Sequence, residues 1–216
     1  MKKSWPNGKQ QEKSWRKQKV KIVGPRLGVA AICSNKMLKA VVIHSQNANN
    51  EELRRLYETA FPEGEQIPYD DLIHLLDVMD IDYTAYYDGE MFVGLTMVLR
   101  LPKYNWGWYF AVREELRGKG YGQIIFTSMV NSYRNSHPYI MDIESPFQPD
   151  APNPEQRQRR YAFYLRNGMK DTGTHRTYNN ITFTILSNSD EPFTKQDYDD
   201  IVAPLRAAWD NMPGKQ

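Results

Sequence analysis

The feature that most constrains the fold is a glycine-rich turn between a predicted strand at 106–112 and a predicted helix at 122–133. The turn reads Arg117-Gly118-Lys119-Gly120-Tyr121-Gly122. Three glycines let the backbone turn tightly and approach a ligand without an intervening Cβ. The helix presents N–H groups and the positive end of its dipole, and Arg117 and Lys119 add positive charge. The segment therefore predicts an anion site, and a pyrophosphate fits it.

Two common nucleotide-binding folds are disfavoured by the place and the ending of this turn. A dinucleotide fold carries its glycine motif after the first strand of a βαβ repeat, with an acidic residue about 20 positions later. Here four predicted strands precede the turn, two of them in a hairpin, and no βαβ repeat follows. A P-loop ends in Gly-Lys and then Ser or Thr, whereas this turn ends in Gly-Tyr-Gly.

The chain from Met37 onward has the pattern of one mixed α/β domain. Hydrophobic periodicity predicts strands at 38–45, 83–87, 91–101, 106–112, 138–143, 174–178 and 181–186. Helices are predicted after Asn49 or Asn50, at 69–79, 122–133 and 155–167, and after Thr194 with a kink at Pro204. Asp88-Gly89 predicts a hairpin turn, and Gly168 predicts a helix C-terminus.

A second motif lies on the predicted helix 155–167. It reads Phe163-Tyr164-Leu165-Arg166-Asn167-Gly168-Met169. With the glycine-rich turn, it resembles the GNAT superfamily of acyl-CoA N-acyltransferases. The main motif of that superfamily is Gln/Arg-x-x-Gly-x-Gly/Ala after a strand. Its second motif is a helix that ends in an aromatic residue, a tyrosine, three further residues and glycine. The order of elements over 38–188 also resembles the family plan.

The resemblance implies the fold and the donor. The fold would be α/β, with a central, mostly antiparallel sheet of six or seven strands, splayed between the fourth and fifth strands and flanked by helices. Acetyl-CoA would lie in the splay, its pantetheine arm paired with backbone near Phe110, Ala111 and Val112. The pyrophosphate would be held by Arg117, Gly118, Lys119, Gly120, Tyr121 and Gly122. Polar residues early in the next helix, Asn153 or Arg157, would touch the CoA.

The resemblance also implies direct attack of an amine on the thioester within a ternary complex. Tyr164 matches the family tyrosine that protonates the leaving thiolate, although periodicity alone would make it a core tyrosine. The N–H of Val112 is the expected donor to the oxyanion. Many relatives carry a carboxylate base on the strand before the turn, but 105–111 has none. Asp142 and Glu144, which share a strand face, are the next candidates. The alternatives are a structural role for both and a water chain as the base.

The acceptor site is predicted from three loops, at 61–70, 102–108 and 174–181. Glu63 and Glu65 would attract a cationic amine, unless they belong to an ordinary solvated loop. Three aromatic residues would line an apolar or cation-binding slot, unless they belong to the core: Trp106, Trp108 and Tyr109.

Charge is distributed unevenly along the chain. The formal net charge is +2, but nine basic residues against Glu12 give residues 1–26 a charge of +8, which leaves −6 for the rest. Residues 1–36 are predicted to be a basic, disordered leader, followed by a single domain at 37–216. Two alternatives stay open, namely that translation begins at Met37 and that residues 1–26 form a nucleic-acid-binding arm.

Composition disfavours several other classes of protein. No run of about 18 apolar residues occurs, so no membrane span is predicted. The one cysteine, Cys33, allows no internal disulfide, and with no convincing signal peptide the protein is predicted to be cytoplasmic. The histidines lie far apart, without metal-ligand spacing, so no metal is predicted.

The predicted function is an N-acetyltransferase acting on a primary amine of a small molecule or a protein. One alternative is a CoA-binding regulator without activity, suggested by the missing strand carboxylate. A nucleic-acid-associated protein is the other alternative. The expected partners are acetyl-CoA and an amine acceptor, with neither a membrane nor a nucleic acid. A homodimer through the C-terminal helix, which carries Trp209, is left open.

Overall fold

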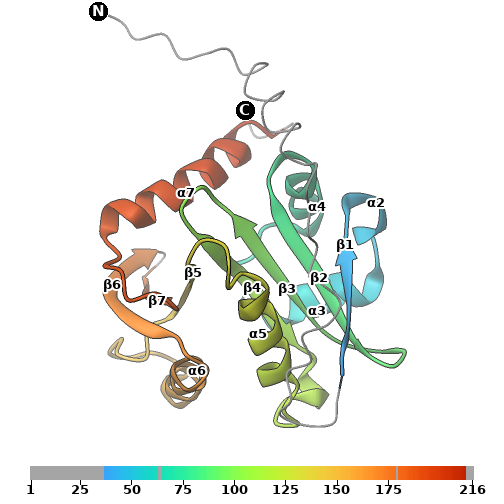
Figure 1. Ribbon diagram of the computed structural model, residues 1–216, viewed down its shortest axis with the longest axis horizontal. Coiled ribbons are helices and arrows are strands. Elements are labelled where there is room, and N and C mark those ends of the chain that lie inside the picture. The colour runs from blue at the N-terminus through green and yellow to red at the C-terminus, as the bar shows by residue number, and fades with distance from the viewer. Residues whose placement is uncertain (1–36, 63–64, 179, 213–216) are drawn as a thin grey trace, which may run out of the picture.

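A seven-stranded sheet, in the order β1-β2-β3-β4-β5-β7-β6, forms the centre of the computed structural model, which describes residues 37–62, 65–178 and 180–212 (Figure 1). The strands are β1 (Lys39–Ile43), β2 (Ile81–Asp88), β3 (Met91–Arg100), β4 (Asn105–Val112), β5 (Tyr139–Glu144), β6 (Lys170–Tyr178) and β7 (Ile181–Ser187). Every neighbouring pair is antiparallel except β4 and β5, which are parallel. The predicted sheet is confirmed. The predicted leader, Cys33 and Glu63 lie outside the described residues.

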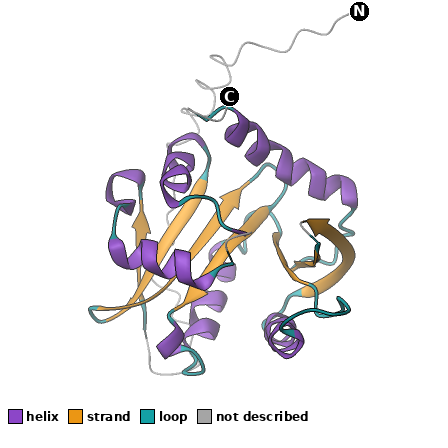
Figure 2. Ribbon diagram, turned by 180° about the vertical axis from the view of Figure 1, so that it is seen from behind, coloured by secondary structure: helices purple, strands orange, loops and turns teal. Residues whose placement is uncertain are grey.

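Helices cover both faces of the sheet (Figures 1 and 2). They are α2 (Ser45–Ala48), α3 (Glu51–Ala60), α4 (Tyr69–Val78), α5 (Tyr121–Ser132), α6 (Pro154–Arg166) and α7 (Lys195–Asp210), with a 3-10 turn η2 (Glu114–Leu116). Leu53 of α3 and Leu72 of α4 join the core on one face, and Phe126 of α5 joins the core on the other. Ile201 of α7 packs in a third cluster with Trp106 of β4.

Local sequence signals set the ends of several elements as predicted. The Asn50 side chain accepts hydrogen bonds from the N–H groups of Glu52 and Leu53 and so caps α3. Thr194 caps α7, which contains Pro204. Gly168 follows α6 with a φ of +89°, a conformation that favours glycine.

Three elements differ from the prediction. The prediction omitted α2 and η2, because four and three residues are too few to show a helical period. Strand β6 begins at Lys170 instead of 174. Its register against β7 shifts between Asp171 and His175, where Gly173 has a φ of +72°. This irregularity breaks the alternation from which a strand is recognised.

The strands β4 and β5 diverge after only three paired positions, 105–107 with 139–141. The register of β4 against β3 also shifts there, because Met97 pairs with Tyr109 while Val98 pairs with Gly107. Trp108 is therefore an extra residue, and such a bulge bends its strand. A Cβ on Gly107 would lie 1.8 Å from the Tyr139 hydroxyl, so the close approach needs glycine. The splay predicted between the fourth and fifth strands is confirmed.

Candidate active site

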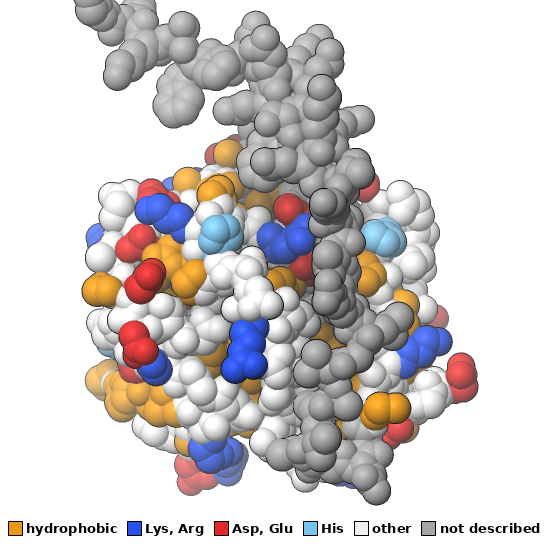
Figure 3. Space-filling model, viewed as in Figure 1, with side chains coloured by type: hydrophobic (Ala, Val, Ile, Leu, Met, Phe, Trp, Pro, Cys, Tyr) orange, Lys and Arg blue, Asp and Glu red, His pale blue; other side chains and the backbone are white. Residues whose placement is uncertain are grey.

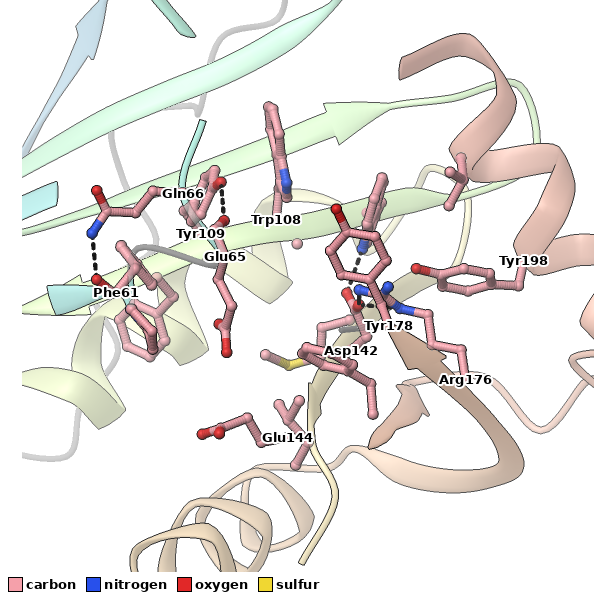
Figure 4. A pocket seen from close by; sticks show the side chains of 18 of the residues that line it. Phe61, Glu65, Gln66, Trp108, Tyr109, Asp142, Glu144, Arg176, Tyr178 and Tyr198 are labelled. Carbon is pink, nitrogen blue, oxygen red and sulfur yellow. Dashed lines mark hydrogen bonds and ion pairs between the residues drawn. The ribbon is translucent and has the colours of Figure 1, made fainter. Parts of the chain in front are cut away.

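A cleft of 1050 Å³ opens where β4 and β5 diverge. Residues of β4, β5, β6, β7, α6 and α7 line it, together with residues 60–62 and 65–67 (Figure 4). The cleft thus joins parts of the chain that are far apart in sequence. The contribution of α7, including Lys195, Asp199 and Arg206, was not predicted.

One wall of the cleft is the part of β4 beyond the bulge. Phe110, Ala111 and Val112 all line the cleft, as the predicted contacts to pantetheine require. Among the described residues, no strand pairs with these three on the side that faces β5. The Val112 carbonyl accepts a hydrogen bond from Arg117. The rest of this edge can accept an extended ligand as a further strand, since N–H and C=O groups at a strand edge are strong hydrogen-bonding groups.

The glycine-rich turn leads from this strand into α5. Gly118 and Gly120 have φ angles of +74° and +85°, and Gly120 is the N-cap of a helix that has no side-chain cap. Gly122 differs from them, because a Cβ added there would lie 3.9 Å from Phe110 and from Val112, an ordinary contact. Two of the three glycines are therefore required by the backbone. The uncapped first turn of α5 suits an anion.

The side chains of the turn divide into two groups. Arg117 lines the cleft, and its Nε donates to the Val112 carbonyl at 3.2 Å, while Lys119 is exposed. Tyr121 is buried, and its hydroxyl donates to Asp88 at 2.6 Å. Residues 118–122, which follow Arg117 in the turn, are not among the residues that line the cleft. An anion there would meet the guanidinium group and the start of α5.

Tyr164 faces the cleft from α6 while most of its ring belongs to the core. Its ring centroid lies 5.1 Å from that of Phe126 and 5.2 Å from that of Phe163. Burial raises the pKa of Tyr164 to about 12, against the opposing effect of Arg160. The phenol therefore keeps its proton at neutral pH. The position suits both readings of Tyr164, as a core residue and as a proton donor.

Asp142 lines the cleft, but hydrogen-bond donors already occupy its carboxylate. Arg176 of β6 donates to Oδ2 from Nε at 3.0 Å and from Nη2 at 2.6 Å. Trp106 donates to Oδ1 at 2.9 Å. The Arg176 guanidinium also lies over the ring of Phe183, at 4.2 Å from its centroid. This arrangement favours the structural role that the sequence left open for Asp142.

Glu144 is held in the same way by two arginines of α6. Arg157 Nη2 lies 2.5 Å from Oε1, and Arg160 Nη1 lies 3.1 Å from Oε2. Arg157 is only 2% exposed, and its Nε donates to Asn153 Oδ1 at 2.8 Å. Asn153 is the N-cap of α6 and lies outside the cleft lining. The side chains predicted to touch CoA thus serve a buried network, and their contact with CoA stays a prediction.

Glu65 was predicted to attract a cationic amine or else to belong to an ordinary solvated loop, and it was not predicted to be a base. It lines the cleft, and its Oε1 is buried without a hydrogen-bond partner. Burial raises the pKa of Glu65; the charges of Glu144 and Asp142 raise it further, whereas Arg160 lowers it. In Figure 4 its carboxylate projects into the open space in front of β4. No local pattern marks this residue, because its position depends on Tyr109, 44 residues away.

Three successive residues hold the segment that carries Glu65. The Tyr109 hydroxyl donates to the Glu65 carbonyl at 2.8 Å. The side-chain amide of Gln66 donates to the Glu58 carbonyl at the end of α3, at 2.9 Å. The N–H of Ile67 donates to the Tyr57 hydroxyl at 2.9 Å. Glu65 is thus fixed by its backbone while its carboxylate stays unpaired.

The predicted aromatic residues contribute unequally to the acceptor side of the cleft. Trp106, Trp108 and Tyr109 all line it, but Trp106 and Tyr109 are largely buried in the core. Trp108 is half-buried, and its ring lies 4.8 Å from that of Tyr109. Tyr178 of β6 is 56% exposed at the cleft. Of the predicted segment 174–181, residues 174–178 line the cleft, whereas of the predicted segment 102–108, residues 102–105 do not.

The described residues also bear on the predictions for a metal site and a membrane span. No group of three or more His, Cys, Asp or Glu gathers among them in a way that could hold a metal ion. None of their helices has both the length and the apolar character needed to cross a membrane. On the face in Figure 3, basic and acidic side chains are interspersed and form no patch of one sign.

The model of the acetyltransferase (GNAT) family matches residues 50–169, more than half of the chain. No curated protein sequence matches the chain.

Solved structures show the same fold at low sequence identity. A protein from Bacteroides thetaiotaomicron assigned to the GNAT family is 17% identical with a TM-score of 0.62; the match covers 81% of this chain and 99% of that one. Ard1 from Thermoplasma volcanium is 14% identical with a TM-score of 0.53, over 69% of this chain and 95% of its own. Naa50 from Arabidopsis thaliana is 13% identical with a TM-score of 0.51, over 70% and 98%.

Proposed function

Because the chain belongs to the GNAT family of acetyltransferases, we propose that it transfers the acetyl group of acetyl-CoA to a primary amine of a small molecule or a protein. The observation that carries this proposal is the unpaired edge of β4, which leads directly into a turn with two left-handed glycines. The edge suits an extended arm, and the turn suits a pyrophosphate. A cytoplasmic location, predicted from the single cysteine, belongs to the same proposal.

Different residues of the chain would bind different parts of acetyl-CoA. Phe110, Ala111 and Val112 would bind the pantetheine arm through their backbone, and the turn at 117–122 would bind the pyrophosphate, with Arg117 as the charged partner. When bound, acetyl-CoA supplies a thioester that an amine can attack. The Arabidopsis Naa50 structure holds a bisubstrate analogue, CoA-Ac-MVNAL, which supports the proposal that donor and acceptor are bound together.

Two groups would act on the reacting atoms. The N–H of Val112 would donate to the oxygen that gains negative charge. Tyr164 would give its proton to the leaving sulfur, since it is protonated at neutral pH and lines the cleft. Asp142 and Glu144 were predicted as bases, but either would first have to give up an arginine partner.

The proposal predicts a specific loss for Tyr164→Phe. We expect kcat to fall about 10²-fold, because general acid catalysis has that order of effect. The affinity for acetyl-CoA should stay the same, since the ring packing is preserved. Steady-state kinetics with a panel of amines would measure turnover, and the rise in melting temperature with acetyl-CoA would measure binding.

The controls separate an enzyme from a regulator. Wild-type protein that binds acetyl-CoA but acetylates no amine would favour the non-catalytic regulator. Wild-type protein whose melting temperature is unchanged by acetyl-CoA would contradict both. Equal kcat in Tyr164→Phe and wild type would leave the acetyltransferase in place and remove the acid role of Tyr164.

A further inference from the structure

The carboxylates of the cleft differ in what neutralises them. Four line it among the described residues: Glu65, Asp142, Glu144 and Asp199. Asp142 is paired with Arg176, and Glu144 with Arg157 and Arg160. Asp199 is exposed on α7, where water solvates it. Glu65 alone combines a buried oxygen with the lack of a hydrogen bond or ion pair.

An unpaired, partly buried carboxylate is unfavourable for folding unless a partner arrives. The hydrogen bonds of Glu65, Gln66 and Ile67 to Tyr109, α3 and Tyr57 fix the backbone against relaxation. A ligand in the cleft can supply the missing partner, and a positively charged group would both donate to the carboxylate and neutralise its charge. A primary ammonium group has the charge and the N–H donors that this oxygen lacks.

The surroundings of Glu65 indicate what the ammonium group is attached to. Phe61, Ile67, Trp108 and Tyr178 line the cleft with it. In Figure 4, Phe61 lies to the left of the Glu65 carboxylate, and Trp108 lies above it and to the right. These side chains offer apolar surface and aromatic faces, which bind hydrocarbon and stack on rings.

We propose that Glu65 binds the ammonium group of the acceptor and then accepts one of its protons, and that the acceptor is a primary amine on an apolar or aromatic body. This inference rests on the proposed acetyl transfer. It assigns to Glu65 the role of the base that the strand before the glycine-rich turn lacks.

Acetyl transfer from the thioester to the ammonium group balances in protons and electrons. One N–H proton moves from the ammonium group to a Glu65 oxygen and later to solvent. The freed nitrogen lone pair forms the C–N bond with the thioester carbonyl carbon, and the C–S bond breaks with its electron pair on sulfur. The sulfur takes a proton from Tyr164. The second proton that nitrogen loses restores the phenol, so amide, thiol and one released proton result.

The ionisation of Glu65 is consistent with this role. Its pKa lies above the usual value, chiefly through burial, and Glu144 and Asp142 of β5 add to the rise while Arg160 and Arg157 of α6 oppose it. A raised pKa makes a carboxylate a stronger proton acceptor. Below that pKa the group is protonated and can neither pair with an ammonium group nor accept its proton. Activity should therefore fall with decreasing pH at a higher pH than for an ordinary glutamate.

The test compares Glu65→Gln with Glu90→Gln, which makes the same change on the exposed hairpin between β2 and β3. The probes are 2-phenylethylamine and its 2,2-difluoro analogue, which has the same body but is much less basic. Glu65→Gln should lower kcat/KM for 2-phenylethylamine about 10²–10³-fold, as loss of a general base does. The loss should be clearly smaller for the difluoro analogue, because it reaches the cleft largely neutral. Glu90→Gln should change neither, and acetyl-CoA should raise the melting temperature of all three proteins equally.

A second measurement does not depend on turnover. Glu65→Gln removes an unpaired buried charge, so its melting temperature at pH 7 to 8 should exceed that of wild type by about 2 °C or more. Because the folded-state pKa is raised, this penalty on wild type is full above that pKa and shrinks as the pH falls below it. The difference should vanish only below the ordinary glutamate pKa of the unfolded chain, where both states are protonated. Glu90→Gln should show no such difference at either pH.

Three results would overturn the inference. The first is an equal loss for both amines in Glu65→Gln, which would remove the proton-accepting role. The second is a larger selective loss in Glu144→Gln, which would assign the base to Glu144. The third is turnover of polar amines but not of 2-phenylethylamine, which would remove the apolar acceptor. If wild type binds acetyl-CoA but acetylates no amine, the proposed function itself fails, and the melting-temperature comparison then reports only on the charge of Glu65.

Discussion

At the scale of single residues, the glycine-rich turn shows that residues of one type can be required for different reasons. Gly118 and Gly120 have positive φ angles, which other residues adopt only at a cost in free energy. Gly122 lies within the first turn of α5, where a methyl group would meet only ordinary contacts with Phe110 and Val112. The shape of the turn therefore depends on its first two glycines.

This difference leads to a prediction for Gly120→Ala. An alanine forced to a φ near +85° should lower the free energy of unfolding by about 1–2 kcal/mol. If it relaxes the turn instead, the start of α5 moves and the KM for acetyl-CoA should rise. The matched control is Gly89→Ala, at a φ of +61° in the β2–β3 hairpin. It should lose similar stability, measured by urea denaturation, but keep its KM; an equal rise in KM in both variants would contradict the role of the turn.

Single residues also show which parts of the site could be predicted from the sequence and which could not. Tyr164 and the glycines could be located because each belongs to a short motif that one segment contains. Whether Asp142, Glu144 or Glu65 is unpaired depends on arginines of α6 and β6 and on a tyrosine of β4. These pairings form only when the sheet assembles. The sequence therefore pointed to Asp142 and Glu144 as candidate bases, although both are paired, and not to the unpaired Glu65.

At the scale of elements, the long helices and the β2–β3 hairpin could be predicted because their periods and turn residues are strong. The short α2, the turn η2 and the first half of β6 could not, since each lacks a repeat or interrupts one. The bulge at Trp108 also has no local signature. It lies beside the close approach of Tyr139 to Gly107, a contact between β4 and β5 that forms only in the assembled sheet.

The junction of α6 with β5 supplies a prediction at this scale. Arg157 and Glu144 connect the two elements through a buried ion pair, with side chains 2% and 8% exposed. Arg157→Met should lower the free energy of unfolding by about 3 kcal/mol, because it leaves a buried carboxylate with one partner fewer. Arg159→Met, on the exposed face of the same helix, should cost less than about 0.5 kcal/mol. Equal effects in urea denaturation would show that the buried pair does not hold α6 to the sheet.

At the scale of the whole molecule, we propose that residues 37–216 form a single domain that does not need the basic segment before it. The seven-stranded sheet and the cleft that the structure describes are both built from residues of this range. The charge of +8 at residues 1–26 belongs to the preceding segment and leaves a domain of net negative charge.

Deleting residues 1–36 should therefore leave the acetyl-CoA-induced rise in melting temperature and the kcat unchanged. Any affinity for nucleic acid should fall and lose its dependence on salt, because that affinity would come from the basic segment. Fluorescence anisotropy with a labelled duplex at two salt concentrations would measure this. A loss of acetyl-CoA binding in the shortened chain would show that the segment belongs to the domain.

The divergence of β4 from β5 has a further consequence. An unpaired strand edge on the outside of a sheet invites another polypeptide chain, with the risk of aggregation. Here the unpaired edge lies in the interior, with β3 on one side, β5 closing the gap at 105–107, and α5 and α6 on the same face. An extended ligand arm can pair with this edge of β4, because β3 already pairs with the other edge. The same bend that exposes the backbone of β4 to a ligand therefore keeps this edge away from the outside of the sheet, where pairing between copies of the chain would begin.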